Sequence, residues 1–291
     1  MSENRERCDV GLKKQQGIQS VKFEEPPIIC AAASVVGQKE GDGPFGDVFD
    51  QIESDPKVGG DTWEDAEGRL QERAAELAIQ KAGCGKEAIR YIVAGDLLGQ
   101  LMASSFGLAG FDKPLFGVYG ACSTMGESIG IGSMLVEGGF ADYVLAMTSS
   151  HFASAEKQFR FPLGYANQRP KASTWTVTGS GAVVICKGDQ KQGMAKITGI
   201  TTGKIVDYGV KDTMNMGACM APAAASVVAA HFKDFGTDPS EYDQIITGDL
   251  GMVGKDILID ILRSEGYDIA DRYIDCGIEI YGRDAQAQAG G

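Results

Sequence analysis

The sequence contains one long internal repeat, and this repeat constrains the fold more than any other feature. Residues 76–99 read ELAIQKAGCGKEAIRYIVAGDLLG, and residues 227–251 read VVAAHFKDFGTDPSEYDQIITGDLG. Each stretch has a helix-like run, a glycine, a short acidic linker, an apolar strand-like run and then Gly-Asp-Leu. Asp96 and Asp249 are therefore equivalent, and they lie 153 positions apart (249 − 96) in a chain of 291 residues. Because this spacing is about half of the chain, we expect one duplicated α/β unit and not a short-period solenoid.

Hydrophobic patterns on both sides of the repeat predict alternating strands and helices. A Gly/Asp-rich excursion follows residue 37, and a long polar and aromatic loop follows residue 150. Strands are expected at 28–37, 89–96, 115–119, 142–150, 181–188 and 243–249, and helices at 64–82, 100–107, after Cys122, at 221–235 and at 255–266. This order is typical of an α/β sheet that is packed by helices.

Composition excludes several classes of protein. The chain is 43% hydrophobic, which allows a sizeable core, and its net charge of −13 argues against binding nucleic acid or an anionic membrane directly. Its seven cysteines include no CxxC pair, so neither a disulfide framework nor a zinc site is indicated. The N-terminus lacks the apolar stretch of a signal peptide, and no run approaches the ~18 apolar residues of a membrane-spanning helix. We expect a polar tail at 1–26, a first half at 27–190 and a second half at 191–291.

The stretch YGACSTMGES, residues 119–128, places Cys122 directly after a predicted strand and at the start of a predicted helix. A helix N-terminus lowers the pKa of a thiol and attracts anions, so this position suits a nucleophile or an anion site. Three alternatives remain at this point: a cysteine that lines a pocket without turnover, a buried inert cysteine, and a nucleophile.

Several motifs resemble one protein family. A duplicated α/β chain with a cysteine that begins a helix in the first half resembles the thiolase and ketoacyl synthase superfamily. Within it, GPFGDVFD, YGACSTMGES, SSHFASAEKQFRFPLGY, MNMGACMAPAAA and TGDLGMVGKDIL resemble the stage V sporulation protein AD family. The resemblance implies a thiolase-like fold, with two duplicated α/β halves in an α-β-α-β-α arrangement. Superfamily halves close with a helix and two strands, whereas this sequence stops at AQAQAGG, so the C-terminal half is expected to be incomplete.

The resemblance also implies a function. Members are non-catalytic and are implicated in the uptake of dipicolinic acid, a pyridine dicarboxylate, into the developing spore. The expected partners are dipicolinic acid or its calcium chelate, and other stage V sporulation A membrane proteins. A homodimer is expected, located peripherally on the inner membrane of the forespore, without nucleic acid as a partner. The alternatives are an active cysteine-dependent acyl-thioester condensing enzyme and a purely structural subunit.

Missing histidines argue against catalysis. Condensing enzymes of the superfamily use a cysteine together with a His and a second His or Asn. Gly248 and Asp249 stand where the first histidine is expected, and Gln288 stands near the second position. A carboxylate beside Cys122 would raise the pKa of the thiol. We therefore expect no catalytic residue.

A planar dicarboxylate needs a flat apolar surface and cationic or N–H donors. The segment EKQFRFPLGYANQRPKASTW, residues 156–175, combines four basic residues with four aromatic ones, although it could equally be an ordinary covering loop. The Met-rich segment 214–222 could be a pocket wall or a core-facing loop. The predicted ligand-binding residues are Cys122, Ser123, Thr124, Ser150, His151, Arg160, Phe161 and Asp249. The acidic loop at 41–55 lacks the EF-hand pattern, so no metal site and no cofactor are expected.

Overall fold

The computed structural model describes residues 14–159, 170–188, 193–282 and 289–290. Its largest sheet has the strand order β4-β3-β8-β7-β5-β6, and β9 also pairs with β3. The strands are β3 (Ile28–Gly37), β4 (Gln51–Glu53), β5 (Tyr91–Asp96), β6 (Leu115–Gly117), β7 (Tyr143–Ser150), β8 (Gly179–Cys186) and β9 (Ala195–Lys196). Strands β5, β6 and β7 are parallel, whereas β8 runs antiparallel to both β7 and β3.

Helix α2 (Trp63–Ala82) covers one face of this sheet. It begins where the Thr62 hydroxyl accepts a hydrogen bond from the Asp65 amide, and it ends at Gly83 in the left-handed conformation, with φ of 60°. Its alanines and Leu70 pack against alternate residues of β3, β5, β7 and β8. The intervening residues of the same strands face helix α4 (Thr124–Glu137) on the opposite side. The alternation of the strands therefore creates two apolar faces, as expected for a sheet buried between helices.

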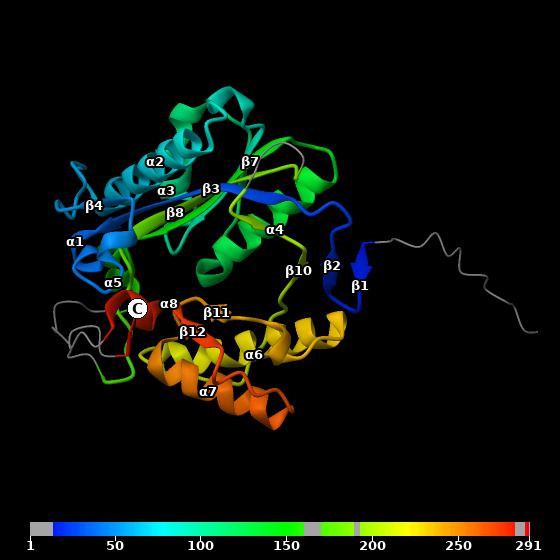
Figure 1. Cartoon of the computed structure of the whole chain (residues 1–291). Helices are drawn as coiled ribbons and strands as arrows, with labels where there is room; N and C mark the ends of the chain where they lie inside the picture. The colour runs from blue at the N-terminus through cyan, green and yellow to red at the C-terminus, as the bar shows by residue number, and fades with distance from the viewer. Residues whose placement is uncertain (1–13, 160–169, 189–192, 283–288, 291) are drawn as a thin grey trace, which may run out of the picture.

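The second half lies beyond α4. It contains a two-stranded parallel sheet of β11 (Ile245–Thr247) and β12 (Tyr273–Asp275), with α6 (Met216–Phe235), α7 (Gly251–Ser264) and the short α8 (Cys276–Tyr281). Figure 1 shows the layers in order: α2 with α3 (Met102–Gly107), the large sheet, α4, the small sheet, and finally α6 with α7. Helices α6 and α7 pack on each other around Leu258 and Leu262, which form a separate core.

The internal repeat corresponds to repeated structure. Helices α2 and α6 both end at a left-handed glycine, Gly83 and Gly236, and these lie 153 positions apart (236 − 83). A short 3₁₀ turn then leads into β5 in the first half and into β11 in the second half. The element order is consequently α2-β5-α3-β6-α4 in the first half and α6-β11-α7-β12-α8 in the second. Helix α6 is therefore the counterpart of α2, and the counterpart of the Cys122 helix is α8.

Two predicted irregular segments contain regular structure. Residues within the predicted N-terminal tail form β1 (Gln15–Gln16) and β2 (Ser20–Lys22), and β2 pairs with β10 (Gly199–Thr201) of the second half. The Asp234 carboxylate at the end of α6 accepts hydrogen bonds from the amides of Ile18 and Gln19 and from the Ser20 hydroxyl. The predicted loop after β7 begins with helix α5 (Phe152–Phe159). Tertiary hydrogen bonds and pairing thus order segments whose polar composition predicts no element.

The Gly/Asp-rich excursion joins the two halves. It contains helix α1 (Gln38–Gly41), a 3₁₀ turn (Gly46–Val48) and β4. The buried Glu40 carboxylate accepts hydrogen bonds from the Thr178 amide, at 3.0 Å, and from the hydroxyl of Tyr281 in α8. Lys39 lies over the rings of Trp175 and Tyr281. No helix in the described ranges has both the length and the apolar character needed to cross a membrane.

Candidate functional site

Cys122 lies in the turn that leads into α4, as the sequence predicts. A 3₁₀ turn (Ala121–Ser123) passes directly into the helix, and Ala121 has a positive φ of 49°. No side chain caps the start of α4. The Ser123 hydroxyl instead donates to the Gly120 carbonyl at 2.8 Å, and it also contacts the Glu127 carboxylate. The amides of the first turn therefore have no side-chain cap, which leaves the positive end of the helix dipole available to an anion.

Thr124 is fully buried at the first position of α4, and its hydroxyl oxygen has no hydrogen-bond partner among the described residues. Buried hydroxyls are normally satisfied, so this one is a donor and acceptor available to a ligand or a water molecule. A glycine is required at position 95 on β5, because a Cβ there would overlap the Val118 carbonyl and crowd the Thr124 methyl group. This close approach brings the start of α4 directly against the end of β5.

Asp249 of the second half lies beside Cys122 of the first half. The Cys122 residue keeps part of its surface in solvent, but protein atoms crowd its thiol. Burial, followed by the negative charge of Asp249 and the nearby Cys219 thiol on α6, raises the pKa of Cys122. Burial and the neighbouring Asp275 raise the pKa of Asp249 itself to about 6. The sequence predicts that Asp249 raises the pKa of Cys122, and the structure shows this direction. A raised pKa disfavours a thiolate at neutral pH.

Cys276 is a second thiol near Asp249. It begins α8, the equivalent of the helix that Cys122 precedes, and burial together with Asp249 and Asp275 raises its pKa to about 11. Asp275 holds this region in place: one of its carboxylate oxygens accepts from the amides of Leu250 at 2.8 Å and Gly251 at 3.1 Å. The turn that carries Asp249 is thereby fixed to β12.

The chain has only two histidines, and both are engaged in packing. His151 is 1% exposed, with its Nε2 atom 2.8 Å from the Pro56 carbonyl and its Nδ1 atom accepting from the Ala153 amide. Its ring lies against Trp63 and Phe152. His151 is one of the predicted ligand-binding residues, and these contacts describe a packing role.

His231 lies on α6 and forms hydrogen bonds with the hydroxyl groups of Thr201 and Tyr242, at 2.9 and 2.8 Å. It therefore belongs to the second-half core, as its position in the helix pattern suggests. Both imidazoles thus form hydrogen bonds with other parts of the fold. The neighbouring side chains that raise the pKa of Cys122 are the carboxyl group of Asp249 and the thiol of Cys219.

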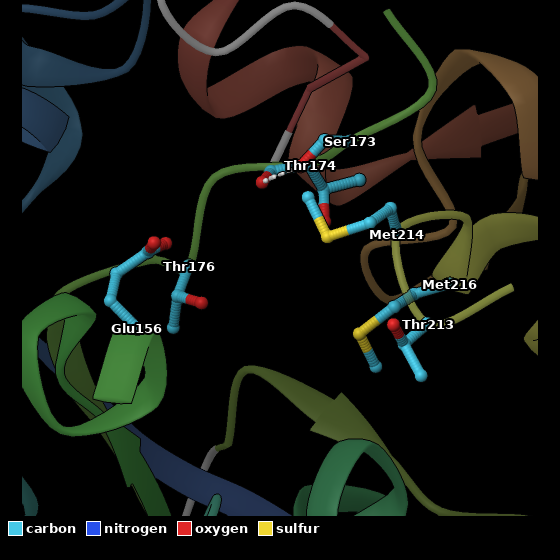
Figure 2. Close-up of a pocket in the computed structure, with 7 residues that line it drawn as sticks. All are labelled: Glu156, Ser173, Thr174, Thr176, Thr213, Met214 and Met216. Carbon is cyan, nitrogen blue, oxygen red and sulfur yellow. Dashed lines mark hydrogen bonds between the residues drawn. The ribbon is translucent and has the colours of Figure 1, made fainter. Parts of the chain in front are cut away.

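A small cavity, partly open to solvent, lies between the two halves. In Figure 2, Glu156 and Thr176 line one side and Met214, Met216 and Thr213 the opposite side, with Ser173 and Thr174 above them. Hydroxyl groups and thioethers dominate this lining, so it offers hydrogen bonds at some points and apolar contact at others. Within the Met-rich segment, Met214 and Met216 line the cavity, whereas Met220 packs into the second-half core.

The other predicted ligand residues are distributed around this region. Ser150 donates to the Val177 carbonyl at 2.6 Å, two strand positions before β8. Trp175 stacks on Phe152, with ring centroids 5.9 Å apart. Arg160, Phe161 and Gln288 lie outside the described residues. Within the described ranges, no cluster of three or more His, Cys, Asp or Glu residues could hold a metal ion.

Sequence reasoning missed several residues of this region: Glu156, Thr213 and Thr176 in the cavity, and the thiols of Cys219 and Cys276. One signal was present for Cys276, because it lies 154 residues after Cys122 (276 − 122), close to the spacing of 153 in the internal repeat. The cavity residues carry no comparable local signal, since they meet only when the halves pack together.

Comparison with known proteins is consistent with this geometry. The solved structures that the chain resembles include 3-oxoacyl-[acyl-carrier-protein] synthase III from Aquifex aeolicus VF5, at 15% identity and a TM-score of 0.55, covering 91% of this chain and 88% of that one. They also include 3-oxoacyl-(acyl carrier protein) synthase III, FabH, from Pseudomonas aeruginosa PAO1, at 15% identity and a TM-score of 0.58, covering 91% and 86% of the two chains. At this identity the likeness establishes a thiolase-like α/β fold and nothing about activity.

Sequence relatives are more specific. The chain is 44% identical over 278 residues to Stage V sporulation protein AD of Bacillus subtilis (strain 168), and the match covers 96% of this chain and 81% of the relative. Residues 17–291 match the family described as Stage V sporulation protein AD (SpoVAD). The chain therefore belongs to the stage V sporulation protein AD family and is a sporulation protein with a thiolase-like fold.

Proposed function

We propose that this protein is a binding protein without condensing activity, and that its ligand is dipicolinic acid, taken up into the developing spore. The observation that carries the proposal is that Asp249 lies beside Cys122, where a condensing enzyme of the superfamily is expected to have an imidazole. Burial, Asp249 and Cys219 all raise the pKa of the thiol. A condensing enzyme needs the opposite arrangement, with a thiolate and neutral N–H donors for the thioester oxygen.

The same residues suit an anionic, planar ligand. The uncapped first turn of α4 offers amides and the dipole, and Thr124 offers a hydroxyl without a partner. The nearby cavity adds threonine hydroxyls for carboxylate oxygens, and Met214 and Met216 for the ring. Asp249, with its pKa raised to about 6, is mostly ionised at pH 7, so its charge opposes an anionic ligand there and is neutralised only at lower pH. Arg160 and Phe161 remain part of the proposal as the charged and aromatic partners of the ligand.

Calcium is a separate question about the ligand. Glu156 and the threonine hydroxyls of the cavity are oxygen donors of the kind that Ca²⁺ takes. The calcium chelate of dipicolinate would present the metal to these oxygens. Titration with dipicolinate in the presence of either CaCl₂ or a chelator separates the two forms of the ligand.

Isothermal titration calorimetry tests the binding role. We expect dipicolinate to bind and isophthalate, which lacks the ring nitrogen, to bind more weakly. Arg160→Ala should weaken binding by roughly tenfold or more, as expected for the loss of a charge-assisted contact, while Cys122→Ala should change affinity only through the shape of the site. Unchanged affinity for dipicolinate in a folded Arg160→Ala variant would show that Arg160 does not bind the ligand. Rapid acylation of Cys122 by an acyl-CoA, with transfer to a second substrate, would replace the proposal with the enzymatic alternative.

The proposal includes a homodimer and a place on the inner membrane of the forespore beside other stage V sporulation A membrane proteins. Strand β6 is the last strand of its sheet, and its residues Leu115 and Phe116 are 38% and 45% exposed. Tyr119, which follows directly, is 54% exposed. An open edge with apolar side chains is a common pairing surface, and here it lies just before Cys122.

A further inference from the structure

A buried carboxyl group on α2 is not among the residues of the site described so far. Glu67 of α2 is 2% exposed. One of its oxygens accepts a hydrogen bond from the Ser149 hydroxyl of β7 at 2.8 Å, and the other accepts from the Ser154 hydroxyl of α5 at 3.0 Å. Glu67 therefore connects helix α2 to the end of β7 and to the first turn of α5.

A second buried carboxyl group shares this network. Asp96, at the end of β5, accepts from the Ser104 amide and hydroxyl and from the Leu101 amide. The Gln71 side-chain amide lies between the two carboxyl groups and donates to the hydroxyl oxygens of Ser104, at 3.0 Å, and Ser149, at 2.7 Å. Asp96 accepts from three donors, whereas Glu67 accepts from only two hydroxyl groups.

One buried acceptor in this network has no hydrogen-bond donor. In the described part of the chain neither Glu67 nor Asp96 forms an ion pair, although both are buried. The side-chain oxygen of Gln71 is buried and accepts no hydrogen bond. Glu67 and Gln71 occupy positions i and i+4 on the same helix face, and both contact the Ser149 hydroxyl. A proton on Glu67 would remove the negative charge from a buried carboxyl group that has no cationic partner in the described part of the chain.

The network is connected to the proposed ligand site. Ser154 lies on α5 two residues before Glu156, which lines the cavity. Ser149 directly precedes Ser150, and the Ser154 hydroxyl also lies 3.0 Å from the carbonyl of His151. A negative charge on Glu67 would therefore lie under the same helix that borders an anionic ligand.

We propose that Glu67 is a proton-operated positioning residue, which is protonated when the anionic ligand is bound and ionised when it leaves. The coupling rests on the proposed function, because it requires an anion in the adjoining site. Binding of the anion and ionisation of Glu67 oppose each other, so ligand binding takes up a proton, and by linkage a lower pH strengthens binding. The titratable groups around Glu67 are Asp96 on β5, Glu64 on α2 and His151 at the junction of β7 and α5.

The electrostatics agree with this geometry. Burial raises the pKa of Glu67 to about 7, and repulsion by Asp96 and Glu64 adds to the rise, while the Ser149 and Ser154 hydroxyls act in the opposite direction. The pKa of Asp249 is also raised, but only to about 6, which is below the pKa of Glu67. The two groups can therefore be separated by the pH at which each ionises.

Infrared spectroscopy tests the protonation of Glu67 directly on the full chain. We expect the carbonyl band of a protonated carboxylic acid to disappear between pH 6 and pH 8 in the wild type and to be missing in Glu67→Gln. Glu72→Gln, on an exposed position of the same helix, is the matched control and should retain the band. Ser154→Ala removes a donor that favours the ionised form, so the band should persist to a higher pH, and this variant keeps the test available if Glu67→Gln does not fold. A band that is unaffected by both substitutions would overturn the proposal.

Calorimetry in two buffers of different ionisation enthalpy tests the coupling. Dipicolinate, whose own carboxyl groups ionise below this range, should bind the wild type and Glu72→Gln about fivefold or more weakly at pH 8.5 than at pH 6, with proton uptake. Glu67→Gln should lose most of this pH dependence. Binding with an unchanged pH dependence in Glu67→Gln would refute the proton coupling alone. If dipicolinate fails to bind any of these proteins at any pH, the proposed function falls, and the infrared titration then decides separately whether Glu67 holds the proton.

Discussion

Replacing Glu67 with glutamine should change how the stability of the protein depends on pH. The pKa of Glu67 is raised from an ordinary value of 4.5 to about 7, so the folded state binds a proton more tightly than the unfolded state. Its contribution to stability is therefore largest at low pH and is lost as the pH rises from 4.5 towards 7. One pKa unit is worth about 1.4 kcal/mol, so the full effect is about 3 kcal/mol, of which about 2.5 kcal/mol falls between pH 5 and pH 8. Because Glu67 is only 2% exposed, screening by solvent reduces this free energy little.

Urea unfolding at a series of pH values measures the effect, with the fluorescence of Trp63 and Trp175 as the signal. The wild type should lose stability relative to Glu67→Gln by about 2.5 kcal/mol between pH 5 and pH 8, because glutamine cannot ionise. Asp249 has a raised pKa in both proteins and so cancels from the comparison. Glu72→Gln should follow the wild type at every pH. A difference between wild type and Glu67→Gln that stays constant from pH 5 to pH 8 would show that Glu67 titrates normally.

Three further predictions concern other parts of the fold. Asp249→Asn removes a charge that raises the pKa of Cys122, so alkylation of this thiol by iodoacetamide at pH 7.5 should become several-fold faster, as measured by mass spectrometry of the Cys122 peptide; an unchanged rate would contradict the electrostatic account. Gly95→Ala should cost about 3 kcal/mol or more in urea unfolding, because its Cβ would overlap the Val118 carbonyl, and a loss below 1 kcal/mol would exclude this contact. Phe116→Asp should convert the proposed dimer into a monomer in light scattering at equal concentration, whereas a dimer that persists would place the interface elsewhere.

Much of the first half could be predicted from local pattern. Helix α2 was expected at 64–82 and is found at Trp63–Ala82, because its apolar spacing and the terminal Gly83 are strong local signals. Helix α5 was predicted as loop, since a polar eight-residue segment becomes helical only when Phe152 and Ser154 contact the rest of the protein. The repeat pairs the helix predicted at 221–235 with α2, and the structure confirms this pairing because both helices end at a left-handed glycine.

The sequence by itself determined the duplication, the α/β class, the position of Cys122 before a helix and the shortage of histidines, because each of these is a property of local pattern or of composition. Only the tertiary structure decided that the Cys219 thiol lies near Cys122 and that a cavity forms where Glu156, Ser173, Thr174 and Thr176 meet Thr213, Met214 and Met216. It alone placed Glu67 against the hydroxyl of Ser149, 82 positions away. These relationships depend on how two sheets and their helices pack, and the pKa of a carboxyl group depends on the atoms that exclude water from it, which no neighbour in the sequence specifies.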